Sequence, residues 1–152
     1  MELNKNSSVE KHEEIKRSIM EDKLSVLKPT LSVRIAPDTP VKEVIHTMVD
    51  KKIGAVLIVE EGRLVGIFSE RDVLKRVALR YNEVAGRPIR EFMTPNPEAL
   101  SINHSLAFTL NRMDVGGYRH IPVTDDQKYP TGIVAARDIL RYLDHKCLGG
   151  PE

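Results

Sequence analysis

The chain has 152 residues, the length of one compact domain or of two small, closely packed ones. It contains 41% hydrophobic and 30% charged residues and no apolar run near the roughly 20 residues of a membrane helix, so we expect a cytoplasmic protein without a signal peptide. The net charge of +1, spread as interleaved acids and bases, argues against nucleic-acid binding, and the lone Cys147 excludes an intrachain disulfide.

The predicted elements begin with a charged segment at 9–27, whose thin apolar stripe indicates a helix. An extended stretch follows at 31–36, and Thr39 then suits an N-cap, with Pro40 at the first helical position. The next apolar residues recur at the spacing of one buried helix face: Val41, Val44, Ile45, Met48 and Val49.

A hairpin and a second helix complete the first half of the chain. The continuous apolar run at 55–59 predicts a strand buried on both faces, and 64–68 returns beside it after a turn at 60–62. The second helix opens near Ser69 and carries four apolar residues: Val73, Leu74, Val77 and Ala78. The segment 80–92 is predicted to be a connector.

The second half repeats this order of elements. A short strand is expected at 99–102, and a hairpin at 120–124 and 132–135. The apolar residues of its two helices are Leu106, Leu110 and Met113 in one and Ile139, Leu140 and Leu143 in the other.

The sequence also repeats itself. Gly66 to Asp72 (GIFSERD) recurs 66 residues later as Gly132 to Asp138 (GIVAARD). We therefore predict an α/β (α+β) fold of two β-α-β-β-α repeats, packed with pseudo-twofold symmetry, plus an N-terminal helix. The expected divisions are an N-terminal segment 1–23, repeat 1 at 24–80, a connector 81–91, repeat 2 at 92–146 and a tail 147–152.

The two GxxxxRD motifs, Met93-Thr94-Pro95 and the run from His120 to Val123 resemble the CBS repeat, named after cystathionine beta-synthase. A pair of such repeats resembles a Bateman module, and the resemblance covers roughly residues 24–144. It implies a non-enzymatic module that binds AMP, ADP, ATP or S-adenosylmethionine between the repeats. It also implies a homodimer, stacked as a disk of four repeats.

The resemblance further implies which residues bind the ligand. The acid that closes each motif would hold the ribose hydroxyls, a hydroxyl three residues earlier would contact phosphate, and a strand would supply the adenine slot. The first site would use Ser69 and Asp72, with Gly54, Ala55 and Val56 beside the base. The second would use Asp138 and Thr94, with His120, Ile121 and Pro122 beside the base. Arg71 and Arg137 would lie on the phosphate side.

Two residues depart from the family pattern. Ala135 replaces the expected Ser or Thr, and Lys28 stands where repeat 1 would have the counterpart of Thr94. Each site therefore lacks one expected group. The intact pair of Ser69 and Asp72 makes the first site slightly the better candidate.

Each of these features also has a purely structural interpretation. Ser69 with Asp72 resembles a helix capping box. Ala135 cannot cap through its side chain, yet Asp138 is still present, which favours a ligand role for the acids. His120 is either a group that titrates near neutral pH or, more simply, a ring that fills space beside the cleft. The other histidines show no metal-ligand spacing.

The sequence contains no nucleophile elbow, no phosphate-binding glycine loop of the P-loop type and no paired base and nucleophile, so we do not expect an enzyme. The leading hypothesis is an adenosine-nucleotide sensor that regulates an unidentified protein. The alternative is a ligand-independent module that dimerises or docks on another protein, with the N-terminal helix as a candidate docking element. Binding of nucleic acid through the connector and the last helix is a third, weaker hypothesis.

Overall fold

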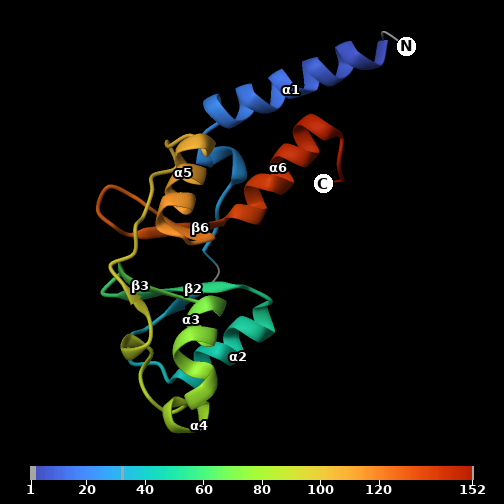
Figure 1. Cartoon of the computed structure of the whole chain (residues 1–152). Coiled ribbons are helices and arrows are strands. Elements are labelled where there is room, and N and C mark those ends of the chain that lie inside the picture. Colours follow the sequence, from blue (N-terminus) through green and yellow to red (C-terminus); the bar gives the residue numbers. More distant parts are fainter. Residues whose placement is uncertain (1–2, 32, 152) are drawn as a thin grey trace.

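A computed structural model describes residues 3–31 and 33–151 (Figure 1). The expected stretch 31–36 therefore includes one residue, Ser32, that lies outside the described residues, and the expected terminal segments include residues 1, 2 and 152, which also lie outside them. The described chain forms two lobes that are stacked end to end, each made of a small sheet and helices.

The first lobe contains the sheet β1-β2-β3-β4. Its strands are β1 (Arg34–Ile35), β2 (Ala55–Glu60), β3 (Arg63–Ser69) and β4 (Thr94–Pro95). β1 runs parallel to β2, and the other two pairs are antiparallel. Its helical elements are α2 (Val41–Lys51), α3 (Glu70–Asp72), the π-helical turn η2 (Val73–Val77), and the short helices η3 (Ala78–Arg80), α4 (Tyr81–Val84) and η4 (Ile89–Glu91).

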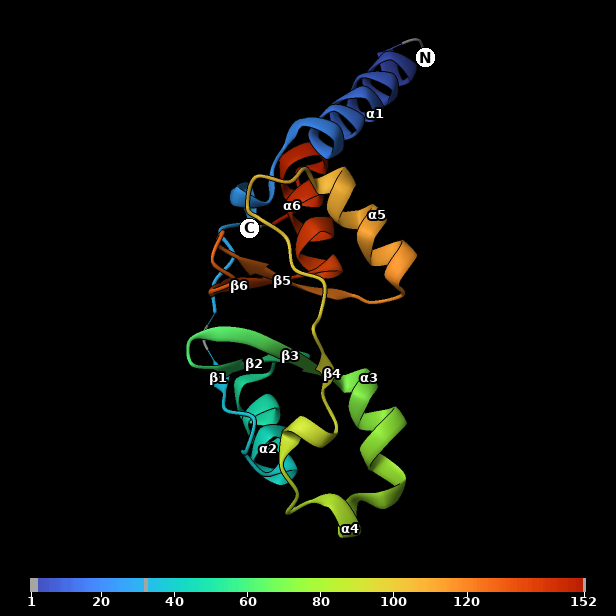
Figure 2. The same ribbon diagram turned by 90° about the vertical axis from the view of Figure 1, so that its left-hand side faces the viewer.

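The second lobe contains the hairpin of β5 (His120–Thr124) and β6 (Pro130–Ala135), with α5 (Leu106–Gly116) and α6 (Ala136–Leu148). The N-terminal helix α1 (Leu3–Glu21) and the 3-10 turn η1 (Leu24–Leu27) belong to this end of the molecule (Figure 2). Leu24 is fully buried in the second core, together with residues of β5, β6, α5 and α6.

Strand β2 is buried on both faces, as its continuous apolar sequence predicted. Val56 and Ile58 point into the first core, which also contains residues of α2. The alternate residues Ala55 and Leu57 form a separate cluster with Ile67, and Ile133 of the second lobe packs against it. Because neighbouring residues of a strand face opposite sides, one strand contributes both to a core and to the contact between the lobes.

Each lobe also holds a short segment from the other half of the chain. β4, at the start of the second repeat, pairs with β3 of the first lobe through Gly66 and Pro95. Pro29, near the start of the first repeat, lies close to Gly132 of β6, where an added Cβ would come within 2.8 Å of it. These two contacts, of β4 with β3 and of Pro29 with Gly132, are equivalent in the two lobes and give the pair its pseudo-twofold symmetry. The repeat boundaries proposed from the sequence remain predictions.

Several local expectations were wrong. The charged segment predicted at 9–27 is divided into α1, which ends at residue 21, and the separate turn η1. The N-cap of α2 is Pro40 rather than Thr39, and the expected strand at 99–102 is reduced to one bridge between Leu100 and Val123. Val49, assigned to the buried face of α2, is exposed because the buried arc of that helix is narrower than the apolar pattern, and the apolar residues Leu74 and Leu140 of later helices are exposed as well.

Within the described ranges, none of the helices is both long enough and apolar enough to cross a membrane.

Candidate functional site

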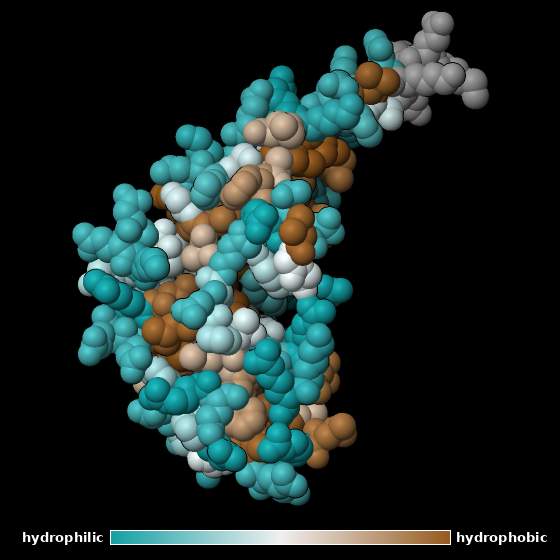
Figure 3. All heavy atoms as spheres, turned by 60° about the vertical axis from the view of Figure 1, so that its left-hand side comes forward, coloured by the Kyte–Doolittle hydropathy of each residue, from teal (hydrophilic) through white to brown (hydrophobic). Residues whose placement is uncertain are grey.

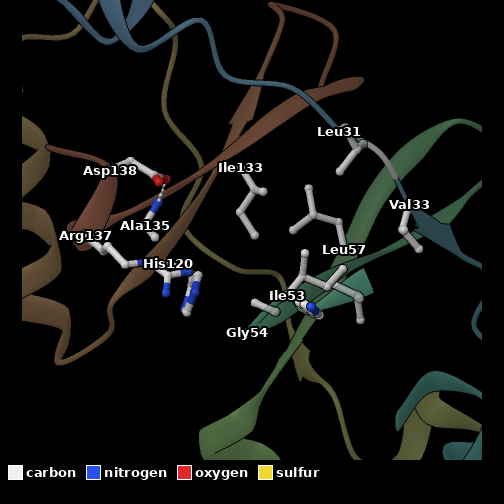
Figure 4. Close-up of a pocket in the computed structure, with 13 residues that line it drawn as sticks. Leu31, Val33, Ile53, Gly54, Leu57, His120, Ile133, Ala135, Arg137 and Asp138 are labelled. Atoms are coloured by element: carbon white, nitrogen blue, oxygen red, sulfur yellow. Dashed lines mark hydrogen bonds between the residues drawn. The ribbon is translucent and has the colours of Figure 1, made fainter. Parts of the chain in front are cut away.

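A cleft opens between the two lobes, and residues of both repeats line it (Figure 4). The lining residues are Leu31, Val33, Lys52, Ile53, Gly54, Ala55, Val56 and Leu57 from the first half, and His120, Ile133, Ala135, Arg137 and Asp138 from the second. In Figure 4 the polar residues Asp138, Arg137 and His120 lie on one side, and Leu31, Val33 and Leu57 lie on the other. The cleft thus has a polar end and an apolar end.

Asp138 is the carboxylate of this cleft. It lies in the first turn of α6, where one oxygen, Oδ2, accepts the backbone N–H of Ala135 at 2.8 Å. Within the described part of the chain, the other oxygen, Oδ1, has no hydrogen-bond donor or cation paired with it. Asp138 therefore keeps most of its acceptor capacity, because an ionised carboxylate has about four acceptor positions.

Asp72, the equivalent acid of the first repeat, is only 8% exposed and is surrounded by donors. Its Oδ2 accepts the backbone N–H and the hydroxyl of Ser69, at 2.9 and 3.1 Å. Its Oδ1 accepts the hydroxyl of Thr94 at 3.2 Å and lies 3.8 Å from Nε of Arg76. This carboxylate is fully engaged by its own chain.

These contacts change the grouping that the sequence suggested. Thr94 was expected beside Asp138 and instead bonds to Asp72. The residues from Gly54 to Val56 were expected beside Asp72 and instead line the cleft of Asp138. The cleft lies beside the second acid, so the structure favours the second site as the candidate where the sequence slightly favoured the first. Sequence alone could not show that each site draws residues from both repeats.

The remaining predicted residues divide into two groups. His120 and Arg137 line the cleft. Ile121 and Pro122 are buried, with Ile121 in the second core, and they are not among the lining residues. Arg71 donates to the backbone carbonyl of Gly117 at the surface and does not line the cleft either.

The apolar wall and one cation of the cleft were not predicted from the sequence. These are Leu31, Val33, Lys52, Ile53, Leu57 and Ile133. For Leu57 the sequence did contain a signal: side chains alternate between the two faces of β2, so Leu57 lies on the same face as the predicted site residue Ala55.

His120 is held between the lobes. A Cβ added at Gly54 would lie 3.1 Å from its Nε2, so Gly54 leaves the space that this ring fills. Burial lowers the pKa of His120 below its ordinary 6.5, although the nearby carboxylates of Glu70 and Asp138 oppose that shift. The imidazole is accordingly neutral at pH 7, which agrees with the space-filling interpretation of this residue.

The structural role of the two acids is also clearer than the sequence suggested. At both positions the carboxylate accepts the backbone N–H of the residue three positions earlier, which is one half of a capping box. That bond needs no hydroxyl at residue 135. The presence of Asp138 after Ala135 is therefore explained by helix capping, and a ligand role must rest on the free acceptor positions of Asp138 instead.

A second cleft also adjoins Asp138. It is lined by Val26, Leu27, Pro29, Ile133, Val134, Asp138, Arg141 and Tyr142. The hydroxyl of Tyr142 donates to Asp22 at 2.8 Å, and Nζ of Lys146 lies at the same distance from that carboxylate. The wall of this cleft is thus tied to the segment that joins α1 to η1.

Comparison with known proteins agrees with the repeats. A family model described as "CBS domain" matches residues 17–79 and 89–145. The CBS domain-containing protein CBSCBSPB5 of Arabidopsis thaliana is 28% identical over 130 residues, which are 84% of this chain and 23% of that protein. This chain thus spans about a quarter of the length of that curated relative.

Two solved structures resemble the whole pair of lobes. A CBS-domain protein of Agrobacterium tumefaciens is 29% identical, with a TM-score of 0.71, over 78% of this chain and 94% of that one. The CBS domain pair of protein MJ0100, in complex with 5′-methylthioadenosine and S-adenosyl-L-methionine, is 27% identical, with a TM-score of 0.69, over 79% and 98% of the two chains.

Proposed function

We propose that this chain, which belongs to the CBS-domain family, is a regulatory module that binds an adenosine ligand in the cleft beside Asp138. The observation that carries the proposal is the carboxylate of Asp138, which lines the cleft and uses only Oδ2 within the chain. A vicinal diol presents two adjacent hydroxyl donors, and a carboxylate with free acceptor positions is the group that binds them best.

The rest of the cleft is consistent with this ligand class. Its apolar end, formed by residues such as Ile53, Leu57 and Ile133, provides a surface on which a flat aromatic base can be buried. The relative whose solved structure contains 5′-methylthioadenosine and S-adenosyl-L-methionine supports the adenosine moiety as the shared chemistry. Candidate ligands are AMP, ADP, ATP and S-adenosylmethionine.

Calorimetric titration of these four compounds into the purified chain tests the proposal. At least one should bind, and Asp138→Asn should weaken it at least about tenfold, because a hydrogen bond to a charged group contributes about 1.5–3 kcal/mol. The amide oxygen of Asn can still accept the N–H of Ala135, so the start of α6 is preserved. Asp114→Asn, an exposed acid on α5, is the matched control. Unchanged affinity in Asp138→Asn would sink the assignment.

We further propose that the chain is a homodimer. Large apolar side chains are exposed on helical elements of both lobes: Val49, Leu74, Leu79, Val115 and Leu140. In Figure 3 apolar side chains interrupt the polar surface of the face shown. Such exposed apolar surface favours association. Light scattering coupled to gel filtration should give twice the chain mass of 17.2 kDa, and a monomeric mass at micromolar concentration would contradict the dimer.

A further inference from the structure

The two halves of the molecule use equivalent carboxylates differently. Asp72 and Asp138 occupy the same position of the repeated motif, yet Asp72 has three hydrogen-bond donors and one cation around it, whereas Asp138 has one donor. Because a carboxylate has about four acceptor positions, three of those of Asp72 accept hydrogen bonds, and the guanidinium of Arg76 lies 3.8 Å from Oδ1. A ribose diol could reach Asp72 only by displacing groups that the chain already provides.

Arg76 supplies the cation beside Asp72. Its Nη1 donates to the backbone carbonyls of Phe92 and Met93, at 3.1 and 2.8 Å, while its Nε faces Asp72. The guanidinium is therefore fixed on the Asp72 side by two neutral acceptors and one charged group. The carbonyls belong to the segment that leads into β4, so the contact also ties that segment to the helix that follows β3.

The equivalent positions of the second repeat hold different residues. Tyr142 stands 66 positions after Arg76, and its hydroxyl is directed to Asp22 instead of to Asp138. Lys28 stands where the counterpart of Thr94 would be. The two groups that contact Oδ1 of Asp72, the guanidinium of Arg76 and the hydroxyl of Thr94, are therefore not repeated beside Asp138.

We propose that Arg76 and Thr94 act as an internal ligand of Asp72, so that the chain binds one adenosine ligand, at Asp138, and uses Asp72 as a clasp between the two repeats. The ligand count rests on the proposed function. The clasp does not, because it concerns only contacts within the chain. The Asp138 half of the pair thus binds the ligand, and the Asp72 half holds the repeats together.

The clasp is tested by thermal unfolding without any ligand. Asp72→Asn removes the charge that Arg76 faces, and Thr94→Val removes the hydroxyl at nearly constant volume. Each should lower the Tm by about 5 °C, whereas the matched variant Asp138→Asn should lower it by less than about 2 °C. Equal shifts at the two acids would overturn the clasp, and the comparison holds whether or not a ligand binds.

The ligand count is tested by calorimetry with the tightest binder among AMP, ADP, ATP and S-adenosylmethionine. We expect one ligand per chain, lost in Asp138→Asn and kept within about threefold in Arg76→Ala. Two ligands per chain would overturn the internal-ligand inference and leave the proposed function standing. A complete lack of binding by all four compounds would instead overturn the proposed function, and the unfolding comparison would still decide the clasp.

Discussion

At the scale of single residues, equal sequence motifs acquire unequal roles through their neighbours. Asp72 and Asp138 both cap a helix with the same backbone bond. Asp72 then meets Thr94 and Arg76, which come from β4 and from the helical segment after β3, whereas Asp138 faces the cleft. Their chemistry is set by which side chains the fold brings to the remaining oxygen.

A glycine shows the same dependence on neighbours. Gly132 lies so close to Pro29 that an added Cβ would come within 2.9 Å of a backbone carbon. Because backbone cannot move aside cheaply, Gly132→Ala should cost about 1–3 kcal/mol of unfolding free energy, measured by urea denaturation. Gly86→Ala is the control, since nothing lies within 4 Å of its added Cβ, and it should be neutral or slightly stabilising. Equal stability of the two variants would contradict the close approach of Pro29.

At the scale of elements, the attachment of α1 is the distinctive feature. Asp22, just after the end of α1, accepts from Tyr142 and Lys146 of α6, and the backbone carbonyl of Asp22 accepts the N–H of Leu106 of α5. Ser18 is buried against Cys147 one turn earlier. The C-terminal end of α1 is thus fastened to two helices, while its residues 6–13 are exposed.

Removal of one hydroxyl should loosen this attachment. Tyr142→Phe keeps the ring and deletes the bond to Asp22, so it should cost about 1 kcal/mol and speed amide hydrogen exchange near the C-terminal end of α1. Tyr129→Phe is the matched control, because the hydroxyl of Tyr129 makes no hydrogen bond within the described ranges. If the amide hydrogens of α1 exchange at the parent rate in both variants, the hydroxyl of Tyr142 does not help to hold α1.

The same cluster predicts a dependence of stability on pH. The hydrogen bond from Lys146, with a further one from Tyr142, holds the pKa of Asp22 below its ordinary 3.8. A depressed pKa in the folded state means that this stabilisation is complete above about pH 4 and is lost as the pH falls below 3.8. Urea denaturation at pH 5 and pH 3 should therefore show a larger loss of stability for the parent chain than for Lys146→Met. Parallel losses would contradict a contribution of the Lys146–Asp22 contact to stability.

At the scale of the whole molecule, the repeat made most of the architecture predictable. The order of elements, the two-faced burial of β2 and the pairing of two similar units follow from periodicity and self-similarity, and the family comparison and the fold confirm them. The sequence did not predict that β4 joins the sheet of the first lobe or that η1 packs in the second lobe. Periodicity shows which face of an element is buried and gives no information on its neighbour, so Thr94 was grouped with the wrong acid.

The ribose of an adenosine ligand is proposed to bind at Asp138 and not at Asp72. The most direct test is a crystal structure of the chain grown with the tightest binder of the four candidate compounds. We predict electron density for one ligand per chain, with its ribose hydroxyls against Oδ1 of Asp138 and its base against Ile133 and Leu57, while Arg76 and Thr94 still contact Asp72. Ligand density at Asp72, or none beside Asp138, would contradict it.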